Sequence, residues 1–530
     1  MDRAGEIWTM ILSVAAVAVI FGTVGVAGGA EKCAWLESAG FDVAIDRHAT
    51  PDLAAAIRPI VDSKPFNEAA KKKPDLSALQ GVQLAVAVTG FETTEEKLTD
   101  EHSVGRVQPH FVAIADTHAW NYQAVSFAEL KLGAFVTEIY DSEPSLEKSD
   151  KHGGKYFTWT AKDGRKAYAL VTDSVIYFGN DESAIDKCLA VRRGESDSVL
   201  KSGKVPPADP ATLASGYVST DGIAQIAALA GLQYATRSSE DEEVQSAVAG
   251  LLPQLIRGIV TDIRWRASGT ENGYEDSLSF GLGPDAAAVF SETLAPASKM
   301  DTGLFGYVPA ASPSVTLYDL AKPNVAWRGL LLTLSSKVDP LGARVVGEFA
   351  NAFAEPYAIR DAEMFLSGVG SNIISVRADA EGEKPALIAT VTNSQAVRGA
   401  LSTDLKPDKA ASDAFGLETL KSEDSMAVFA GSVVVIGDID AVTACIRSRS
   451  DASGMGLAGL FRPGSTAVTY TAENEQTAGI VQMLSAAKSD EMAVKTIVVT
   501  ETRFNKNAIE RKTTSDFGLI GSIIAQLAQD

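Results

Sequence analysis

Short apolar runs with a period of two alternate along this chain with segments whose apolar residues recur every three or four positions. The period-two runs predict β-strands, at residues 83–89, 110–116, 155–160, 166–171 and 174–178. Residues 120–136 carry apolar side chains at the spacing of one helix face. A polar turn at Lys162–Arg165 predicts a hairpin. We therefore expect an α+β fold of mostly antiparallel strands with helices on one face of the sheet.

The pattern occurs twice. Residues 174–189 match residues 432–446 when one residue is skipped in the second copy, so that Cys188 coincides with Cys445 and Gly179 with Gly437. In the two copies, Ser183 and Asp440 are the predicted helix starts. Four further pairs of segments match: Val43–Asp46 with Thr316–Asp319, Gln123–Ala128 with Gln395–Ala400, Ile259–Trp265 with Val498–Phe504, and Ser279–Leu282 with Asp516–Leu519.

These matches predict one unit used twice, in tandem. The first α+β lobe is expected over residues 31–300 and the second over residues 301–530. Superposition of the two lobes should place Phe280 over Phe517, because apolar positions matched in order specify matched packing.

Residues 1–30 differ from the rest of the chain. Residues 7–30 carry no charge and are long enough to cross a bilayer as an N-terminal anchor. Their small-residue end, Val26–Ala30, is instead typical of a signal-peptide cleavage site. Either way we expect an exported protein, periplasmic or attached to the membrane, with residues 7–30 as its one contact with the membrane.

Composition and charge narrow the partners. The net charge is −21, with acidic residues spread along the chain, so nucleic acid is not an expected partner. The chain has three cysteines, at positions 33, 188 and 445. Cys188 and Cys445 occupy matching places in different lobes, which predicts two separate buried thiols rather than a disulfide.

Candidate chemistry is sparse. The sequence contains no Cys-x-x-Cys, His-Glu-x-x-His, phosphate-loop or Gly-x-Ser-x-Gly motif. His110, Asp116 and His118 are candidate metal ligands, with both histidines on one face if the strand is continuous. Since residues 301–530 contain no histidine, we expect no metal and no cofactor in the repeated unit. Asp46 and Asp319, matched between the copies, are candidate ligand-binding residues; the alternative is that each caps a helix.

The export segment, the duplicated strand–helix unit and the closing Phe-Gly-Leu helix loosely resemble uncharacterised families of bacterial envelope and secreted proteins. The resemblance implies no activity and no catalytic residues. The sequence favours a non-enzymatic envelope protein that binds a partner protein or scaffolds through its two lobes. One alternative is a periplasmic carrier of an apolar ligand such as a lipid. The other is a hydrolase whose site is assembled from scattered residues.

Overall fold

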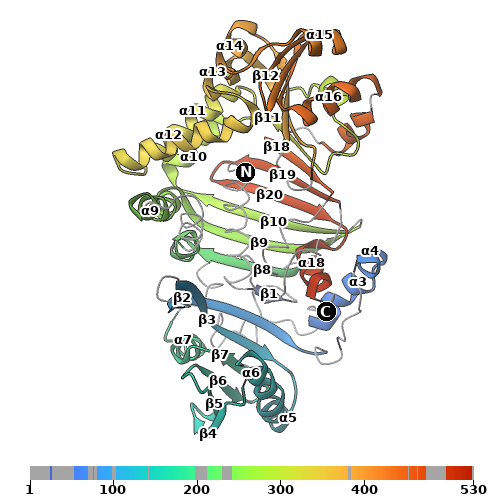
Figure 1. Cartoon of the computed structure of the whole chain (residues 1–530). Helices are drawn as coiled ribbons and strands as arrows, with labels where there is room; N and C mark the ends of the chain where they lie inside the picture. Colours follow the sequence, from blue (N-terminus) through green and yellow to red (C-terminus); the bar gives the residue numbers. More distant parts are fainter. Residues whose placement is uncertain are drawn as a thin grey trace. The chain divides into compact units, whose positions relative to one another are not determined.

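Antiparallel strands and the helices packed on them make up the part of the chain that the computed structural model describes (Figure 1). That part comprises residues 24–26, 53–69, 76, 80–97, 103–140, 142–196, 212–228, 242–271, 273–379, 384–451, 453–461, 464–472 and 497–527. Helices and antiparallel strands occur together along the chain, which confirms the predicted α+β class.

The chain forms two compact units. Unit 1 comprises residues 1–14, 226–262 and 277–518, and unit 2 comprises residues 15–225, 263–276 and 519–530. This division is one of contacts in space. The lobe boundary near residue 300 is a statement about the sequence repeat and stays a prediction.

Unit 2 contains an antiparallel sheet in the order β4–β5–β6–β7–β3–β2–β1–β8. Its strands are β1 (Val24–Val26), β2 (Gln83–Lys97), β3 (Ser103–Asp116), β4 (Ser145–Lys151), β5 (Gly154–Thr160), β6 (Lys166–Thr172), β7 (Val175–Gly179) and β8 (Thr212–Ser219). Its helices are α3 (Leu53–Val61), α4 (Lys64–Ala69), α5 (Asn121–Phe127), the π-helix η3 (Ala128–Leu132), α6 (Gly133–Ile139) and α7 (Glu182–Arg192). A further helix covers residues 220–228.

Unit 1 contains an antiparallel sheet in the order β14–β15–β16–β17–β13–β12–β11–β18–β19–β20. Its strands are β11 (Ser314–Asp319), β12 (Val369–Arg377), β13 (Pro385–Val391), β14 (Lys406–Pro407), β15 (Glu418–Lys421), β16 (Ser425–Ala430), β17 (Val433–Asp438), β18 (Ala467–Thr471), β19 (Val498–Asn505) and β20 (Ala508–Ser515). The strands β9 (Val260–Thr270) and β10 (Gly273–Leu282) belong in part to each unit, since Ile263–Asp276 is assigned to unit 2. They pair with each other, and β10 also pairs with β20.

The helices that accompany these strands vary in length. They are α9 (Glu242–Ile259), α10 (Pro284–Thr293), η4 (Thr302–Tyr307), α11 (Pro323–Ser335), α12 (Pro340–Ala354), η5 (Glu355–Tyr357), α13 (Ala362–Gly368), α14 (Ser394–Ala400), α15 (Lys409–Phe415), α16 (Ile439–Asp451) and η6 (Ser453–Leu460). The last helix, α18 (Gly518–Leu527), belongs to unit 2 from Leu519 on.

The pairing order is the same in the two sheets from β4 to β8 and from β14 to β18. In each sheet, two strands consecutive in the sequence pair with each other, β6 with β7 and β16 with β17. The next strand in the sheet, β3 or β13, comes from earlier in the chain. Cys188 and Cys445 lie on equivalent helices, α7 and α16, as free buried thiols, which confirms that they are separate. Burial raises the pKa of each thiol to about 12, so neither is reactive at neutral pH.

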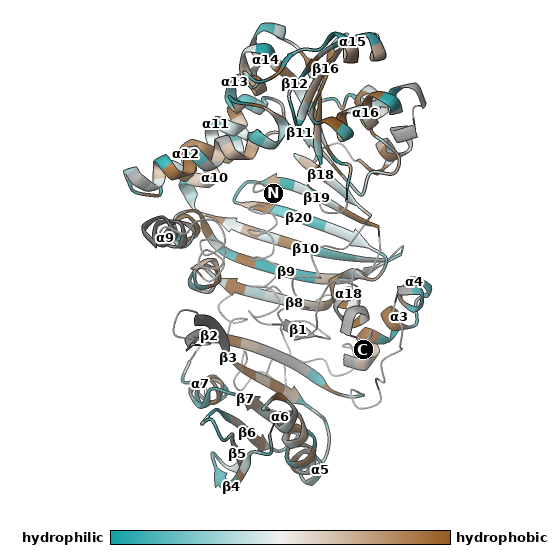
Figure 2. Cartoon of the chain, viewed as in Figure 1, coloured by the Kyte–Doolittle hydropathy of each residue, from teal (hydrophilic) through white to brown (hydrophobic). Residues whose placement is uncertain are grey.

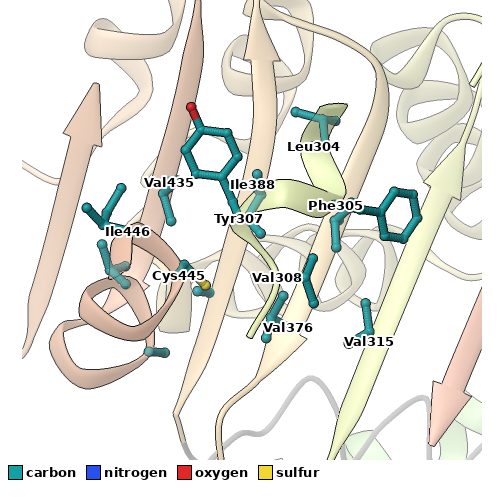
Figure 3. Packing of buried hydrophobic residues seen from close by; sticks show 14 of the residues in the cluster. Leu304, Phe305, Tyr307, Val308, Val315, Val376, Ile388, Val435, Cys445 and Ile446 are labelled. Atoms are coloured by element: carbon teal, nitrogen blue, oxygen red, sulfur yellow. The ribbon is translucent and has the colours of Figure 1, made fainter. Parts of the chain in front are cut away.

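Helices cover both faces of each sheet, so the expectation of helices on one face was wrong. In unit 1, η4, α16 and η6 pack on one face, where Figure 3 shows Cys445 and Ile446 near Val435 and Ile388. The other face packs against η5, α13 and α14. In unit 2, α7 packs on one face and α5–α6 on the other. The reason is visible in β7, whose residues are all buried: a strand covered on both sides is apolar throughout.

Two local predictions were also wrong. The helix caps are Asp181, which accepts a hydrogen bond from Ser183 N, and Asp438, which accepts from the backbone N–H groups of Asp440 and Ala441. Each acid stands two residues before the predicted start, because a carboxylate caps a helix best from just outside it. Phe280 lies within β10, whereas Phe517 lies between β20 and α18, so these two residues are not in the same element.

Residues 7–30 lie outside the described residues except for Val24–Val26, which form β1. Among the helices that are described, none is both long enough and apolar enough to cross a membrane.

Candidate functional site

Asp319, a residue of the repeat, lies at the end of β11 and is buried. Its carboxylate accepts a hydrogen bond from the Asn372 side-chain amide at 2.6 Å and another from the Ala297 backbone N–H. Burial raises the pKa of this carboxyl group. The helix that follows, α11, has no side-chain cap, so Asp319 is neither a helix cap nor a surface residue. The hydrogen bond between Asp319 and Asn372 links the side chains of β11 and β12.

The counterpart of this pair in unit 2 is incomplete. By register, Gln83 on β2 takes the place of Asn372 on β12. Gln83 precedes Leu84, which pairs with Ala115, and Asn372 precedes Ile373, which pairs with Ala389. Gln83 is buried, and its Oε1 atom has no hydrogen-bond partner among the residues that the structure describes. The sequence counterpart of Asp319 is Asp46, which lies outside the described residues.

Replacing Asp319 by alanine is expected to lower the free energy of unfolding by about 2 kcal/mol, since it leaves the buried side-chain amide of Asn372 without this acceptor. Urea unfolding measures the change. The matched control is Asp404→Ala, at an exposed position of the same unit, which should change stability by less than about 0.5 kcal/mol. Equal stability of the Asp319→Ala chain and the parent would contradict a structural role.

Of the three candidate metal ligands, Asp116 and His118 lie close together, with His118 Nδ1 3.6 Å from Asp116 Oδ1, but His110 is not brought to them. β3 ends at Asp116, so the strand is not continuous to His118, whose backbone φ is 49°. His110 lies six residues before Asp116, about 20 Å along an extended strand. Asp116 accepts hydrogen bonds from Ser174 Oγ at 2.8 Å and from His118 N at 3.1 Å, which fixes the turn after β3. Within the described ranges, no three His, Cys, Asp or Glu side chains group as metal ligands.

Large apolar side chains are exposed along the helical segment α5–η3–α6 of unit 2. We call the following five residues the apolar face, with their exposed fractions: Trp120 74%, Phe127 41%, Leu130 64%, Phe135 45% and Ile139 53%. Such side chains are normally buried, and a contiguous exposed group of them marks a surface that contacts something else.

The π-helical turn η3 brings these residues onto one side. Each α-helical residue advances about 100°, so in a regular helix Phe135 and Ile139 would lie on the same side as the buried Ala124 and Ala128. One extra residue in the turn rotates the following segment back by about 100°. Phe135 and Ile139 then align with Trp120, Phe127 and Leu130. The buried state of Val136, which a regular helix would expose, agrees with this rotation.

The apolar face rests on a rigid base. Phe135 packs edge-on against Phe178 of β7 at a centroid distance of 6.0 Å, and Trp159 of β5 packs against the same ring at 6.4 Å. At the start of α5, the Asn121 side chain donates to the Asp173 carbonyl oxygen at 3.2 Å. The segment is therefore held from both ends of its length, and its exposed side chains project from a fixed surface.

The charges bordering the apolar face are few. Glu129 of η3 forms a salt bridge with Lys148 of β4 at 2.6 Å. The sequence from 121 to 139 contains one basic residue, Lys131. A surface with a large apolar centre, one aromatic anchor in Trp120 and a sparse, mixed-charge border has the composition of a protein-binding patch. The sequence predicted the helix here, but its apolar spacing indicated a buried face only.

Comparisons with known proteins add no family. No family model matches the chain, and no curated protein matches it. Among solved structures, crystal form I of TP0453 is similar at 9% identity over 43% of this chain and 98% of that chain. The TM-score of that comparison is 0.24, which is too low for any argument about fold or function.

Proposed function

We propose that this chain is an exported, non-enzymatic binding protein of the bacterial envelope, and that its apolar face docks onto a partner protein. The exposed side chains of Trp120, Leu130 and Ile139 on a rigid helical segment are the observation that carries the proposal. Export rests on the uncharged residues 7–30. A binding role in place of catalysis rests on the lack of catalytic motifs in the sequence.

Charge favours a protein over a lipid surface as the partner. Helices that lie on anionic membranes carry many Lys and Arg residues beside their apolar face. The segment 121–139 contains only one Lys or Arg residue, Lys131, in a chain of net charge −21. Aromatic anchors surrounded by a few paired charges, as in Glu129–Lys148, are instead typical of protein interfaces.

Site-specific photo-cross-linking in the native envelope tests the proposal. A photoreactive phenylalanine at Leu130 should give a discrete adduct with one protein, whereas the same probe at Leu332 of α11 should not. Leu332 is the matched control because its exposed fraction is also 64%. Trp120→Ser should reduce the Leu130 adduct at least tenfold without unfolding the chain, since aromatic anchors dominate interface energies.

The identified partner, once purified, should bind the chain and lose affinity at least tenfold with Trp120→Ser. An adduct of two copies of this chain would replace the proposal with self-association. Flotation of the chain with neutral vesicles, lost in Trp120→Ser, would replace it with membrane binding. Equal labelling from Leu130 and Leu332 would remove the apolar face as a docking surface.

A further inference from the structure

One face of the unit 1 sheet carries a row of threonines that crosses four strands. Thr316, Thr469, Thr500 and Thr513 stand directly opposite one another on β11, β18, β19 and β20. The hydroxyl oxygens of Thr316 and Thr469 are 3.0 Å apart, and those of Thr500 and Thr513 are also 3.0 Å apart. These distances place all four side chains on the same face, as the register requires. A row of hydroxyls offers both donors and acceptors.

Arg511 lies on this face, next to the threonine row. It pairs with Thr502, two residues along from the Thr500–Thr513 pair, and side chains two residues apart on a strand share a face. On its other side are Phe504 and Ile509, which pack against the apolar cluster of α10 and α11. Figure 2 shows that β20 is hydrophilic over most of its length.

No described carboxylate neutralises Arg511. The acidic residues of β19 and β20 have other partners: Glu501 forms a salt bridge with Arg503 at 2.8 Å, and Glu510 accepts a hydrogen bond from Asn505 at 3.0 Å. Glu501 and Glu510 alternate with Thr502 and Arg511 and so belong to the opposite face. Burial lowers the pKa of Arg511 to about 10, with no neighbouring charge acting against it. A partly buried guanidinium without a counter-charge is costly unless something pairs with it.

We propose that Arg511 and the threonine row bind a phosphate group. The planar guanidinium matches two phosphate oxygens, and hydroxyl groups donate to the others. Residues two apart along a strand are separated by about 7 Å, a gap that one phosphate hydrogen-bonded on both sides can bridge. The site lies on different residues from the apolar face, and the inference does not depend on the proposed function.

Calorimetric titration of the purified chain with inorganic phosphate, in a buffer free of other oxyanions, tests this site. Binding should be saturable, one phosphate per chain. Arg511→Met should abolish it, and Arg511→Lys should weaken it at least tenfold because lysine lacks the planar fork. Thr513→Val should weaken it severalfold. The control Arg503→Met, on the opposite face of β19, should leave the affinity unchanged.

Thermal unfolding gives a second readout, in which the melting temperature without phosphate tests the uncompensated charge itself. Without phosphate, Arg511→Met should melt higher than the parent, since it removes an uncompensated charge. With phosphate, the parent alone should gain in melting temperature. A lower melting temperature for Arg511→Met together with an unchanged response to phosphate would overturn the proposal.

Two further ligands identify the source of the phosphate. Short-chain phosphatidic acid binding at least tenfold more tightly than inorganic phosphate would assign a lipid head group, whose chains would meet Phe504 and Ile509. Equal affinity would assign a free phosphate. Acetate binding as tightly as phosphate would overturn the assignment of phosphate as the ligand class.

Discussion

Replacing Gly437 by alanine is expected to lower the free energy of unfolding by about 4 kcal/mol. Gly437 lies in β17 opposite Ala386, and an added Cβ would overlap the carbonyl oxygen of Pro385. Its φ of 148° is also a conformation that other residues rarely adopt. Relief would require β13 and β17 to separate, which breaks the centre of the sheet.

The repeat extends this prediction to unit 2. An added Cβ at Gly179 would overlap the carbonyl oxygen of Phe111 on β3, so Gly179→Ala should cost about 3 kcal/mol, less than Gly437→Ala because its φ is not positive. Gly306→Ala is the control, since a Cβ there meets nothing within 4 Å. Chemical denaturation monitored by tryptophan fluorescence measures all three. A Gly437→Ala chain as stable as Gly306→Ala would show that β13 and β17 are not packed as described.

The unfolding free energy should also depend on pH through Asp276. This residue of β10 is buried, and its carboxylate accepts hydrogen bonds from the Trp265 side chain at 3.1 Å and from Leu519 N, at the start of α18, at 2.7 Å. Burial raises the pKa of Asp276 to about 6, and the two hydrogen bonds oppose that rise without cancelling it.

The sign follows from proton binding. Between pH 4 and pH 6 the folded chain holds a proton on Asp276 that the unfolded chain has released, so stability decreases as pH rises through this range. A shift of about two pKa units corresponds to about 3 kcal/mol, present at pH 4 and lost by pH 7. Relative to an Asp276→Asn chain, the parent should therefore be about 3 kcal/mol more stable at pH 4 than at pH 7.

Urea unfolding of the parent and of Asp276→Asn at both pH values gives this difference. The matched control is Asp173→Asn, at a side chain that is 89% exposed, which should change stability by less than about 0.5 kcal/mol. A constant difference between Asp276→Asn and the parent from pH 4 to pH 7 would mean that Asp276 titrates as an ordinary carboxyl group.

The sequence predicted those strands and helices in which the period of the apolar residues matched the burial of their side chains. The hairpin of 155–160 and 166–171 appears as β5 and β6 within one residue, because alternation and turn residues agreed there. β2 continues to Lys97 and β3 begins at Ser103, beyond the predicted ends. Their outer halves, such as Glu92–Lys97, are polar, and backbone pairing alone extends them. Apolar periodicity cannot detect such an extension.

Most of the residues of the candidate sites could not be predicted from the pattern of apolar and polar residues. The π turn that aligns Phe135 with Phe127 leaves no clear mark in composition, so the apolar face could not be separated from a buried helix face. Arg511, Thr500 and Thr513 share the hairpin of β19 and β20, but Thr469 and Thr316 join their row only because β18 and β11, which are far apart in the sequence, pair in one register. Asp276 did carry a signal: an acid at an inward position of a strand, between Tyr274 and Leu278, predicts a buried carboxylate.

The short strand β1 lies within residues 1–30, so any cleavage after Ala30 would change the sheet of unit 2. Val24–Val26 fill the place between β2 and β8 that β11 fills between β12 and β18. Cleavage after Ala30 would remove β1 and leave the neighbouring edges of β2 and β8 without hydrogen-bond partners.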